Sequence, residues 1–172
     1  HFPVRIPDST ERGGVQVSIF GKFFGKGRGE PVIIVSGLPR SGTSMAMKML
    51  EAAGIEPFQD GIRAADDDNP KGYYEFEQVK ELDKSPDKSW VKRARGKALK
   101  VISYLLKDLP PDNDYRVVFM HRHLEEVLKS QAKMLERRGE KNDISDDRMT
   151  EIYEIHLRDV KRLLEEPLRL LV

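Results

Sequence analysis

The sequence predicts an α/β domain with three layers, in which a central parallel sheet is flanked by helices. Two observations lead to this fold class. Short β-branched runs alternate along the chain with amphipathic helical segments, as in strands joined by crossover helices. The first run, at residues 32–35, is apolar throughout, which is typical of a strand buried on both faces. We therefore expect a sheet that is covered by helices.

The composition excludes several classes of protein. The 172 residues carry 30 Lys plus Arg against 29 Asp plus Glu, so the net charge of +1 argues against a nucleic-acid binder that depends on bulk charge. The absence of cysteine excludes disulfides, thiolate metal sites and a cysteine nucleophile, and favours a cytoplasmic location. No apolar run approaches the roughly 20 residues of a membrane span, so we expect none.

The N-terminal residues 1–30 are expected to form a flexible arm. Their GKFFGKGRG segment has no helical period and many glycines. The glycines at 25, 27 and 29 precede a strand, whereas a dinucleotide fingerprint follows a strand and opens a helix. We therefore place the folded domain at residues 31–172.

Apolar periodicity predicts the remaining elements in order. Met45, Ala46, Met49 and Leu50 share one side of a helix over residues 44–53, and Gly54 follows as its stop. Further elements are a short helix at 73–82, strands at 98–102 and 116–120, amphipathic helices at 124–135 and 149–164, and a last strand at 168–172.

The loop between the first strand and the first helix carries the chemistry. Residues 37–44 read GLPRSGTS, and backbone amides and a helix dipole converge on an anion in such a loop. Read against the nucleotide-binding pattern G-x-x-x-x-G-K-[ST], Gly37, Gly42 and Ser44 match, but Thr43 replaces the lysine. Since phosphoryl transfer depends on that lysine, this change speaks against an NTPase. Arg40 supplies a different cation.

The same loop resembles that of a known family. The run Pro39, Arg40, Ser41, Gly42, Thr43 and Ser44 is similar to the 5′-phosphosulfate-binding loop P-[KR]-S-G-T-[TS] of sulfotransferases that use 3′-phosphoadenosine 5′-phosphosulfate (PAPS). The resemblance implies a P-loop-type fold and transfer of a sulfuryl group from PAPS to a hydroxyl or amine, with no metal. Arg40 and the loop amides would then stabilise the charge that grows on the leaving oxygen.

A second motif agrees with the first. Arg122 closes the third predicted strand and Ser130 follows eight positions later in the next helix, which resembles the family's 3′-phosphate pair. An arginine fork at the carboxyl end of a strand suits a phosphate. The likeness extends over about residues 32–135.

The general base must be sought outside these two motifs. Small-molecule sulfotransferases carry a histidine just beyond the second strand, where this chain has Lys100 to Ser103. The tyrosylprotein enzymes use a glutamate beyond the loop helix, and Asp60 lies near that place. Asp60 is therefore our first candidate for the base, and the alternative is a turn aspartate before Gly61.

Other conspicuous residues have ordinary structural interpretations. His121 and His123 flank Arg122 and are secondary candidates, while His156 lies in an apolar helical stripe and is expected to pack. Trp90 either covers an acceptor or anchors its segment. The acidic run at 66–68 and the basic cluster of Lys92, Arg93, Arg95 and Lys97 are expected to be solvated surface.

Three hypotheses remain at this point. The first is a PAPS-dependent sulfotransferase whose partners are the nucleotide and an unidentified acceptor. The second is a P-loop kinase or NTPase with a degenerate loop, which would bind ATP with Mg²⁺. The third is a noncatalytic nucleotide-binding protein. The family's glycine-rich basic loop for the 3′-phosphate is absent after Leu171, so either the chain is incomplete at its C-terminus, or residues are omitted there, or the cofactor site is reduced.

Overall fold

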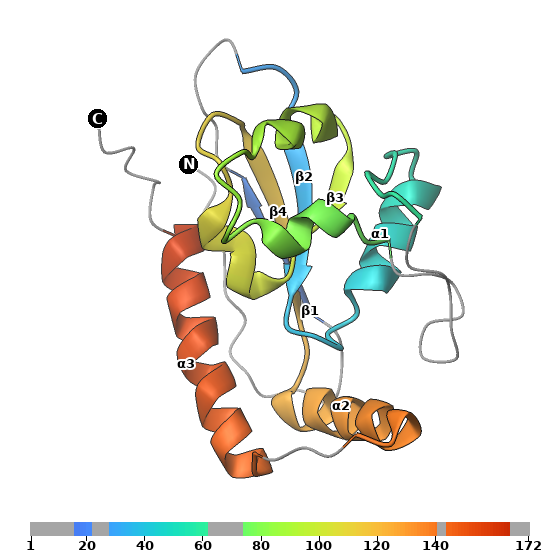
Figure 1. Cartoon of the computed structure of the whole chain (residues 1–172), viewed down its shortest axis with the longest axis vertical. Coiled ribbons are helices and arrows are strands. Elements are labelled where there is room, and N and C mark those ends of the chain that lie inside the picture. Colours follow the sequence, from blue (N-terminus) through green and yellow to red (C-terminus); the bar gives the residue numbers. More distant parts are fainter. Residues whose placement is uncertain (1–15, 22–27, 62–73, 141–143, 166–172) are drawn as a thin grey trace.

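The computed structural model describes residues 16–21, 28–61, 74–140 and 144–165 (Figure 1). With η marking a 3₁₀ helix, the order is β1 (Gln16–Gly21), β2 (Val32–Gly37), α1 (Thr43–Ala52), η1 (Glu77–Glu81), η2 (Ser89–Ala94), β3 (Ala98–Lys100), η3 (Ser103–Asp108), β4 (Tyr115–His121), α2 (Leu124–Arg138) and α3 (Asp146–Glu165). Within these ranges, the helices include none that is long and apolar enough to cross a membrane.

The described strands form one sheet in the order β1-β4-β2-β3. β2 lies in the middle of the parallel part and pairs in parallel with β3 on one side and β4 on the other. This arrangement confirms the predicted α/β class and parallel sheet. The carboxyl ends of β2, β3 and β4 therefore meet at one edge, where ligands bind in open α/β sheets.

β1 corrects the expectation for the N-terminal arm. Gln16–Gly21 pairs antiparallel with β4 from Gln16 opposite His121 to Gly21 opposite Arg116, so this part of residues 1–30 is a strand and no flexible arm. The reason is tertiary, since the edge of β4 offers unpaired backbone donors and acceptors that no local pattern reveals. Residues 1–15 and 22–27 lie outside the described part.

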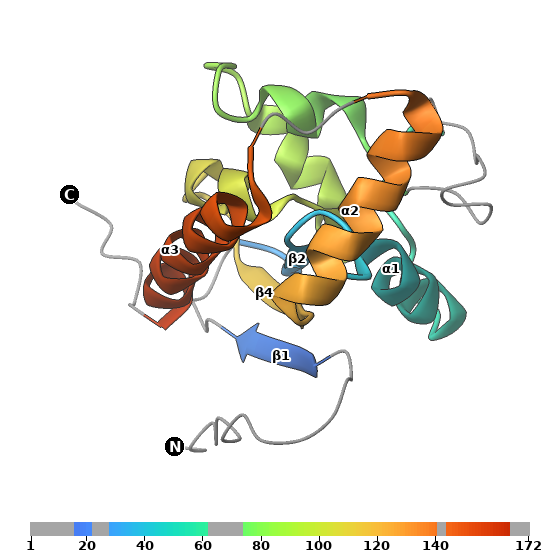
Figure 2. The ribbon, with the colours of Figure 1, turned by 90° about the horizontal axis from the view of Figure 1, so that it is seen from below.

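The two faces of the sheet carry different layers (Figures 1 and 2). Side chains alternate along each strand, so Val32 and Ile34 face one side and Val35 the other. The first side packs against η1 to η3 and Val160 of α3, and the second packs against Ala46 and Met47 of α1. The parallel sheet is thus flanked by helices, as predicted.

Several predicted boundaries change in the structure. The short helix expected at 73–82 is reduced to the 3₁₀ turns of η1, and the strand expected at 98–102 ends at Lys100. The strand expected at 168–172 lies outside the described residues. The two long C-terminal helices are confirmed, and they pack through Val127, Leu128 and Tyr153 over Leu38, the second residue of the predicted phosphate loop.

Candidate functional site

The predicted loop lies where the sheet topology favours a ligand. It leaves the carboxyl end of β2, the strand from which the chain goes first to β3 on one side and later to β4 on the other. Such a reversal of strand order opens a crevice above the sheet. Gly37 ends β2 opposite Met120 of β4, and Arg122 follows two residues later, so both sequence motifs meet at this crevice.

The loop is held in one conformation by its close packing. A Cβ at Gly37 would clash with Ser41 Oγ and lie 2.8 Å from the Met120 carbonyl oxygen, so only glycine fits there. Arg40 has φ 65°, a left-handed backbone that is uncommon outside glycine, and Gly42 has φ 99°. The buried Leu38 fixes the start of the loop beneath α2.

The loop places the first turn of α1 at the crevice. Gly42 is the N-cap of α1 and makes no side-chain cap. The first N–H groups of a helix have no intrahelical partner, and the helix dipole places partial positive charge beside them. Gly42, Thr43, Ser44 and Met45 all line the cavity described below. This end of α1 therefore suits an anion.

The two predicted motifs converge on Arg40. Arg40 Nε donates to Ser130 Oγ at 3.0 Å, and Arg122 Nη1 donates to the Arg40 carbonyl oxygen at 3.0 Å. Arg122 Nε also donates to Glu126 at 2.9 Å, and this bond lowers the pKa of the Glu126 carboxyl. Ser130 of α2 and Arg122, which follows β4, thus contact the loop arginine although they lie 90 and 82 residues from it along the chain.

A cavity of about 530 Å³ opens in front of this cluster. Its volume lies within the range of small-ligand sites, which is about 300–1,000 Å³. Of the six loop residues 39–44 predicted to bind the cofactor, five line it, and Arg122 and Ser130 line it as well; the five are Pro39, Arg40, Gly42, Thr43 and Ser44. The arrangement can hold an anionic ligand between the loop, β4 and α2.

Ser41 is the predicted loop residue that does not line the cavity. Its side chain is 1% exposed and packs against Gly37, and its backbone N–H donates to the Leu38 carbonyl oxygen at 3.2 Å. Ser41 is therefore buried behind the cavity, and its contact with the cofactor stays a prediction. Ser41 closes the turn that places Arg40.

Three charged cavity residues, Glu75, Lys80 and Lys100, were missed in the sequence. Lys100 ends β3, and its ammonium donates to Ser44 Oγ at 3.3 Å and lies 3.6 Å from Glu75 Oε1. Both side chains are largely buried, with 17% of Lys100 and 21% of Glu75 exposed. The position of Lys100 at the carboxyl end of a parallel strand was a usable signal, whereas no local pattern marks Glu75.

Asp60 supports the segment that carries Glu75. Asp60 is exposed and is not among the described residues that line the cavity. Its carboxylate accepts a hydrogen bond from the Glu77 N–H, and its own N–H donates to the Glu75 carbonyl oxygen at 3.3 Å. Asp60 therefore braces residues 75–77, and its geometry does not favour the role of base.

Trp90 and three histidines, His121, His123 and His156, are not among the described residues that line the cavity. His156 packs between α3 and η3, where its ring stacks on Tyr104 and its Nε2 shares a 2.8 Å hydrogen bond with Ser103 Oγ. Burial lowers the pKa values of His156 and His121. Trp90 is an anchor, since it is 9% exposed and packs 5.0 Å from the ring of Phe76.

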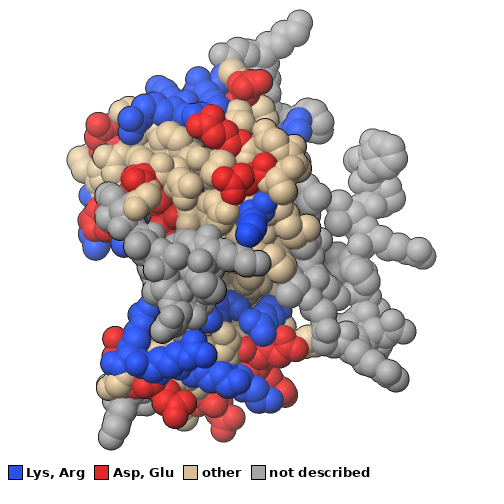
Figure 3. Space-filling view, turned by 90° about the vertical axis from the view of Figure 1, so that its right-hand side faces the viewer, with Lys and Arg blue, Asp and Glu red and all other residues tan. Residues whose placement is uncertain are grey.

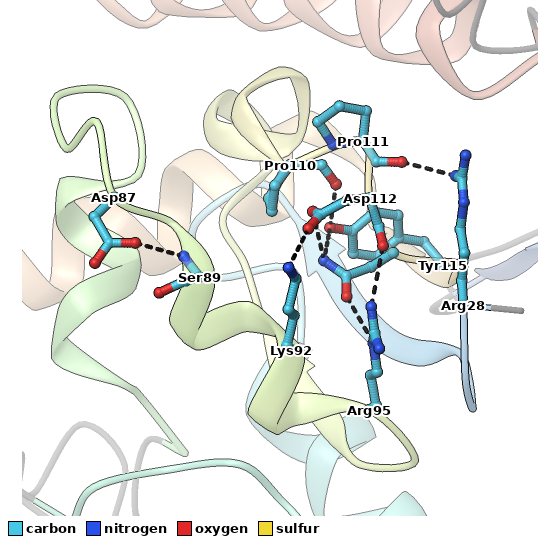
Figure 4. Close-up of polar contacts among 10 residues, drawn as sticks. Arg28, Asp87, Ser89, Lys92, Arg95, Pro110, Pro111, Asp112 and Tyr115 are labelled. Atoms are coloured by element: carbon cyan, nitrogen blue, oxygen red, sulfur yellow. Dashed lines mark hydrogen bonds and ion pairs between the residues drawn. The ribbon is translucent and has the colours of Figure 1, made fainter.

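The basic cluster before β3 has structural partners (Figure 4). Lys92 pairs with Asp112 at 2.8 Å, and Arg95 donates to the Asn113 side chain at 2.8 Å. Lys97 pairs with Glu56 at 2.6 Å. These contacts tie η2 and β3 to neighbouring loops.

The remaining findings concern metals and known proteins. In the part of the chain that is described, no group of three or more His, Asp or Glu side chains is placed to hold a metal ion. The acidic run at 66–68 lies outside that part. No family model, curated protein or solved structure matches the chain.

Proposed function

We propose that the chain is a P-loop-type sulfotransferase that transfers a sulfuryl group from PAPS to a hydroxyl or amine of an acceptor. One observation carries the proposal. Arg40, Arg122 and Ser130, which the two sequence motifs single out, are linked by hydrogen bonds at the wall of one cavity, beside the N-terminus of α1. The proposal thus depends on the motifs and on their convergence.

The residues around the cavity fit an anionic nucleotide. Arg40 and Arg122 supply fixed positive charge, and the first turn of α1 supplies backbone donors. Their partners are mostly neutral oxygens, the Ser130 hydroxyl and the Arg40 carbonyl, which a phosphate or sulfate oxygen replaces at low cost. Glu126 keeps one carboxylate beside Arg122.

The chemical task of these groups is to stabilise a leaving oxygen. Sulfuryl transfer breaks the bond between sulfur and the oxygen that bridges to the 5′-phosphate, so negative charge develops on that oxygen. Preorganised donors aimed at developing charge lower the barrier, typically by about 3–4 kcal/mol per donor. Arg40 and the N–H groups of Gly42, Thr43 and Ser44 are the donors that this chain offers.

A kinase or NTPase is the second candidate. Thr43 occupies the lysine position of the nucleotide loop, and Lys100 reaches Ser44 from β3 at 3.3 Å. Lys100 therefore brings an ammonium near the loop from another strand. This single observation is the reason to test the binding of ATP with Mg²⁺ as the alternative to PAPS.

Calorimetric titration with 3′-phosphoadenosine 5′-phosphate distinguishes the two, with ATP and Mg²⁺ titrated in parallel. We expect binding of the bisphosphate, and we expect ATP with Mg²⁺ to bind at least about tenfold more weakly, a difference of about 1.4 kcal/mol. Binding of ATP with Mg²⁺ alone would place the chain among kinases and NTPases. Binding of neither nucleotide would contradict both candidate activities.

A further inference from the structure

The cavity has two walls of different chemistry. The wall made by the loop, β4 and the start of α2 is polar, as described above. We call the second the apolar wall; it consists of Phe76, Val79, Ile102, Leu105 and Met134, and the side chains of Lys80 and Gln131 line the cavity as well. A polar wall suits the nucleotide, and an apolar wall suits the body of a second ligand that has few hydrogen-bonding groups.

The apolar wall is rigid and partly open to solvent. Phe76 is fixed by the rings of Trp90 at 5.0 Å and Phe58 at 4.6 Å. Ile102 is 39% exposed, so a large apolar side chain is left partly open to solvent beside the cavity. A ligand that covers Ile102 and Leu105 gains hydrophobic free energy in proportion to the area that it removes from water.

Glu75 lies at the junction of the two walls. It precedes Phe76 of the apolar wall, and its carboxylate lies 3.6 Å from the ammonium of Lys100, which reaches Ser44 of the loop. A carboxylate beside the acceptor and a cation beside the transferred group are the charges that the reaction needs at this point.

Backbone strain supports a functional role for this junction. Among the described residues, the non-glycine residues with positive φ are Arg40 at 65° and Tyr74 at 52°. Tyr74 immediately precedes Glu75 and is held by burial and by a 2.7 Å hydrogen bond to Glu51. Strained residues persist where the surroundings fix them and concentrate at functional sites. Both lie at this cavity or next to one of its lining residues.

We infer that the acceptor is an alcohol or phenol with an apolar body, and that Glu75 accepts its proton. This inference rests on the proposed function. The apolar body lies on Ile102 and Leu105, and the hydroxyl reaches Glu75. The acceptor oxygen forms a bond to sulfur, and the bond from sulfur to the 5′-phosphate oxygen breaks with its electron pair. The acceptor proton passes to the Glu75 carboxylate, so the products are a sulfate ester, the bisphosphate and a protonated Glu75.

The same walls disfavour sugars and charged peptides. A carbohydrate would place several hydroxyl groups against Phe76, Ile102 and Leu105, and burying a polar group without a hydrogen-bond partner is unfavourable. Each unpaired hydroxyl thus lowers the affinity, whereas a naphthol ring leaves none unpaired. The acceptor class therefore follows from the wall that faces Glu75.

The test uses the full chain, PAPS with radiolabelled sulfate, and four acceptors: 2-naphthol, 1-octanol, N-acetylglucosamine and an acidic tyrosine peptide. We expect transfer to 2-naphthol or 1-octanol, with kcat/KM at least about tenfold above the other two acceptors. Preferred transfer to the sugar or the peptide would overturn the acceptor class. Failure of the bisphosphate to bind in the calorimetric experiment would instead remove the proposed function itself.

Matched variants test the two roles. Glu75→Gln should lower kcat at least about 100-fold, while the affinity for the bisphosphate is unchanged. Glu81→Gln, on the exposed side of η1, is the control. Ile102→Asn should raise KM for 2-naphthol about tenfold with little change in kcat, and Ile155→Asn, 44% exposed on α3, is its control. An unchanged kcat in Glu75→Gln with bisphosphate binding intact would overturn the role of Glu75.

Discussion

Two groups of basic side chains differ in the partners that hold them. Near β3, Lys92 and Lys97 each pair with a carboxylate, and Arg95 donates to Asn113 and to the Asp112 carbonyl oxygen. At the cavity, Arg40 donates to a hydroxyl and Arg122 to a backbone carbonyl as well as to Glu126. The first group joins loops of the protein, and the second surrounds an open volume.

The difference teaches how to recognise a binding site. Lys92 and Lys97 are neutralised by carboxylates and do not line the cavity that the structure describes, whereas Arg40 is held by a hydroxyl oxygen at the cavity and still attracts an anion. Figure 3 shows Lys and Arg side chains gathered in more than one area of the surface, including the lower end where α2 lies. Density of charge alone therefore does not locate the ligand.

The largest expected effect separates the two groups directly. Arg40→Ala should weaken binding of 3′-phosphoadenosine 5′-phosphate about 100-fold, or roughly 2.7 kcal/mol, because it removes a charged donor from the anion. Arg95→Ala should leave that affinity unchanged, since Arg95 is not among the described residues that line the cavity and its side chain joins neighbouring loops. Calorimetric titration measures both. Equal losses of nucleotide affinity in the two variants would contradict the distinction between the two groups of basic side chains.

The next effect tests whether the loop backbone is needed to present the cations. Gly37→Ala should lower the free energy of unfolding by about 1–3 kcal/mol, because its methyl group would meet Ser41 and the Met120 backbone. The same change should reduce nucleotide affinity by displacing Arg40. Thermal unfolding and titration measure the two consequences.

Gly54→Ala is the control for this loop substitution. Gly54 has a positive φ of 87°, but a methyl group added there would meet no heavy atom within 4 Å. The substitution should therefore cost only the backbone strain, about 1–2 kcal/mol, and leave nucleotide affinity unchanged. A loss of affinity in Gly54→Ala as large as in Gly37→Ala would contradict the role given to the loop.

The smallest effect concerns the structural group. The hydrogen bond from Lys92 lowers the pKa of the Asp112 carboxyl below its usual value, so the pair adds stability above about pH 3.9 that is lost as the pH falls through the lowered pKa. Asp112→Asn should lower stability at pH 7 by less than about 1 kcal/mol, because the pair is half exposed. The difference between the two proteins should shrink toward pH 3 in thermal unfolding. A difference that grows on acidification would contradict this account.

Local patterns predicted the elements whose signal lies within a single segment. The buried run of β2, the glycine loop and the stripes of α2 and α3 each carry their own periodicity, so all were found. The convergence of Arg40, Arg122 and Ser130 also agrees with the two motifs.

The features that the sequence did not reveal depend on contacts between distant segments. β1 exists because β4 has an edge to pair with, and Glu75 enters the cavity because Tyr74 and Asp60 hold its segment. Asp60 has the residue type of a base and stands near the expected place, yet its contacts make it a brace. Residue type and spacing cannot separate these two roles.

The position of β1 has a consequence for how the protein behaves in solution. Every residue from Gln16 to Gly21 is paired with β4, so the strand that ends at the candidate site is not exposed along that side. The opposite edge is β3, which is only three residues long. Short or covered edges resist pairing with a second chain. In the described sheet the N-terminal strand thus takes the place of β4 at the edge, and its loss would expose β4 to sheet extension by another molecule.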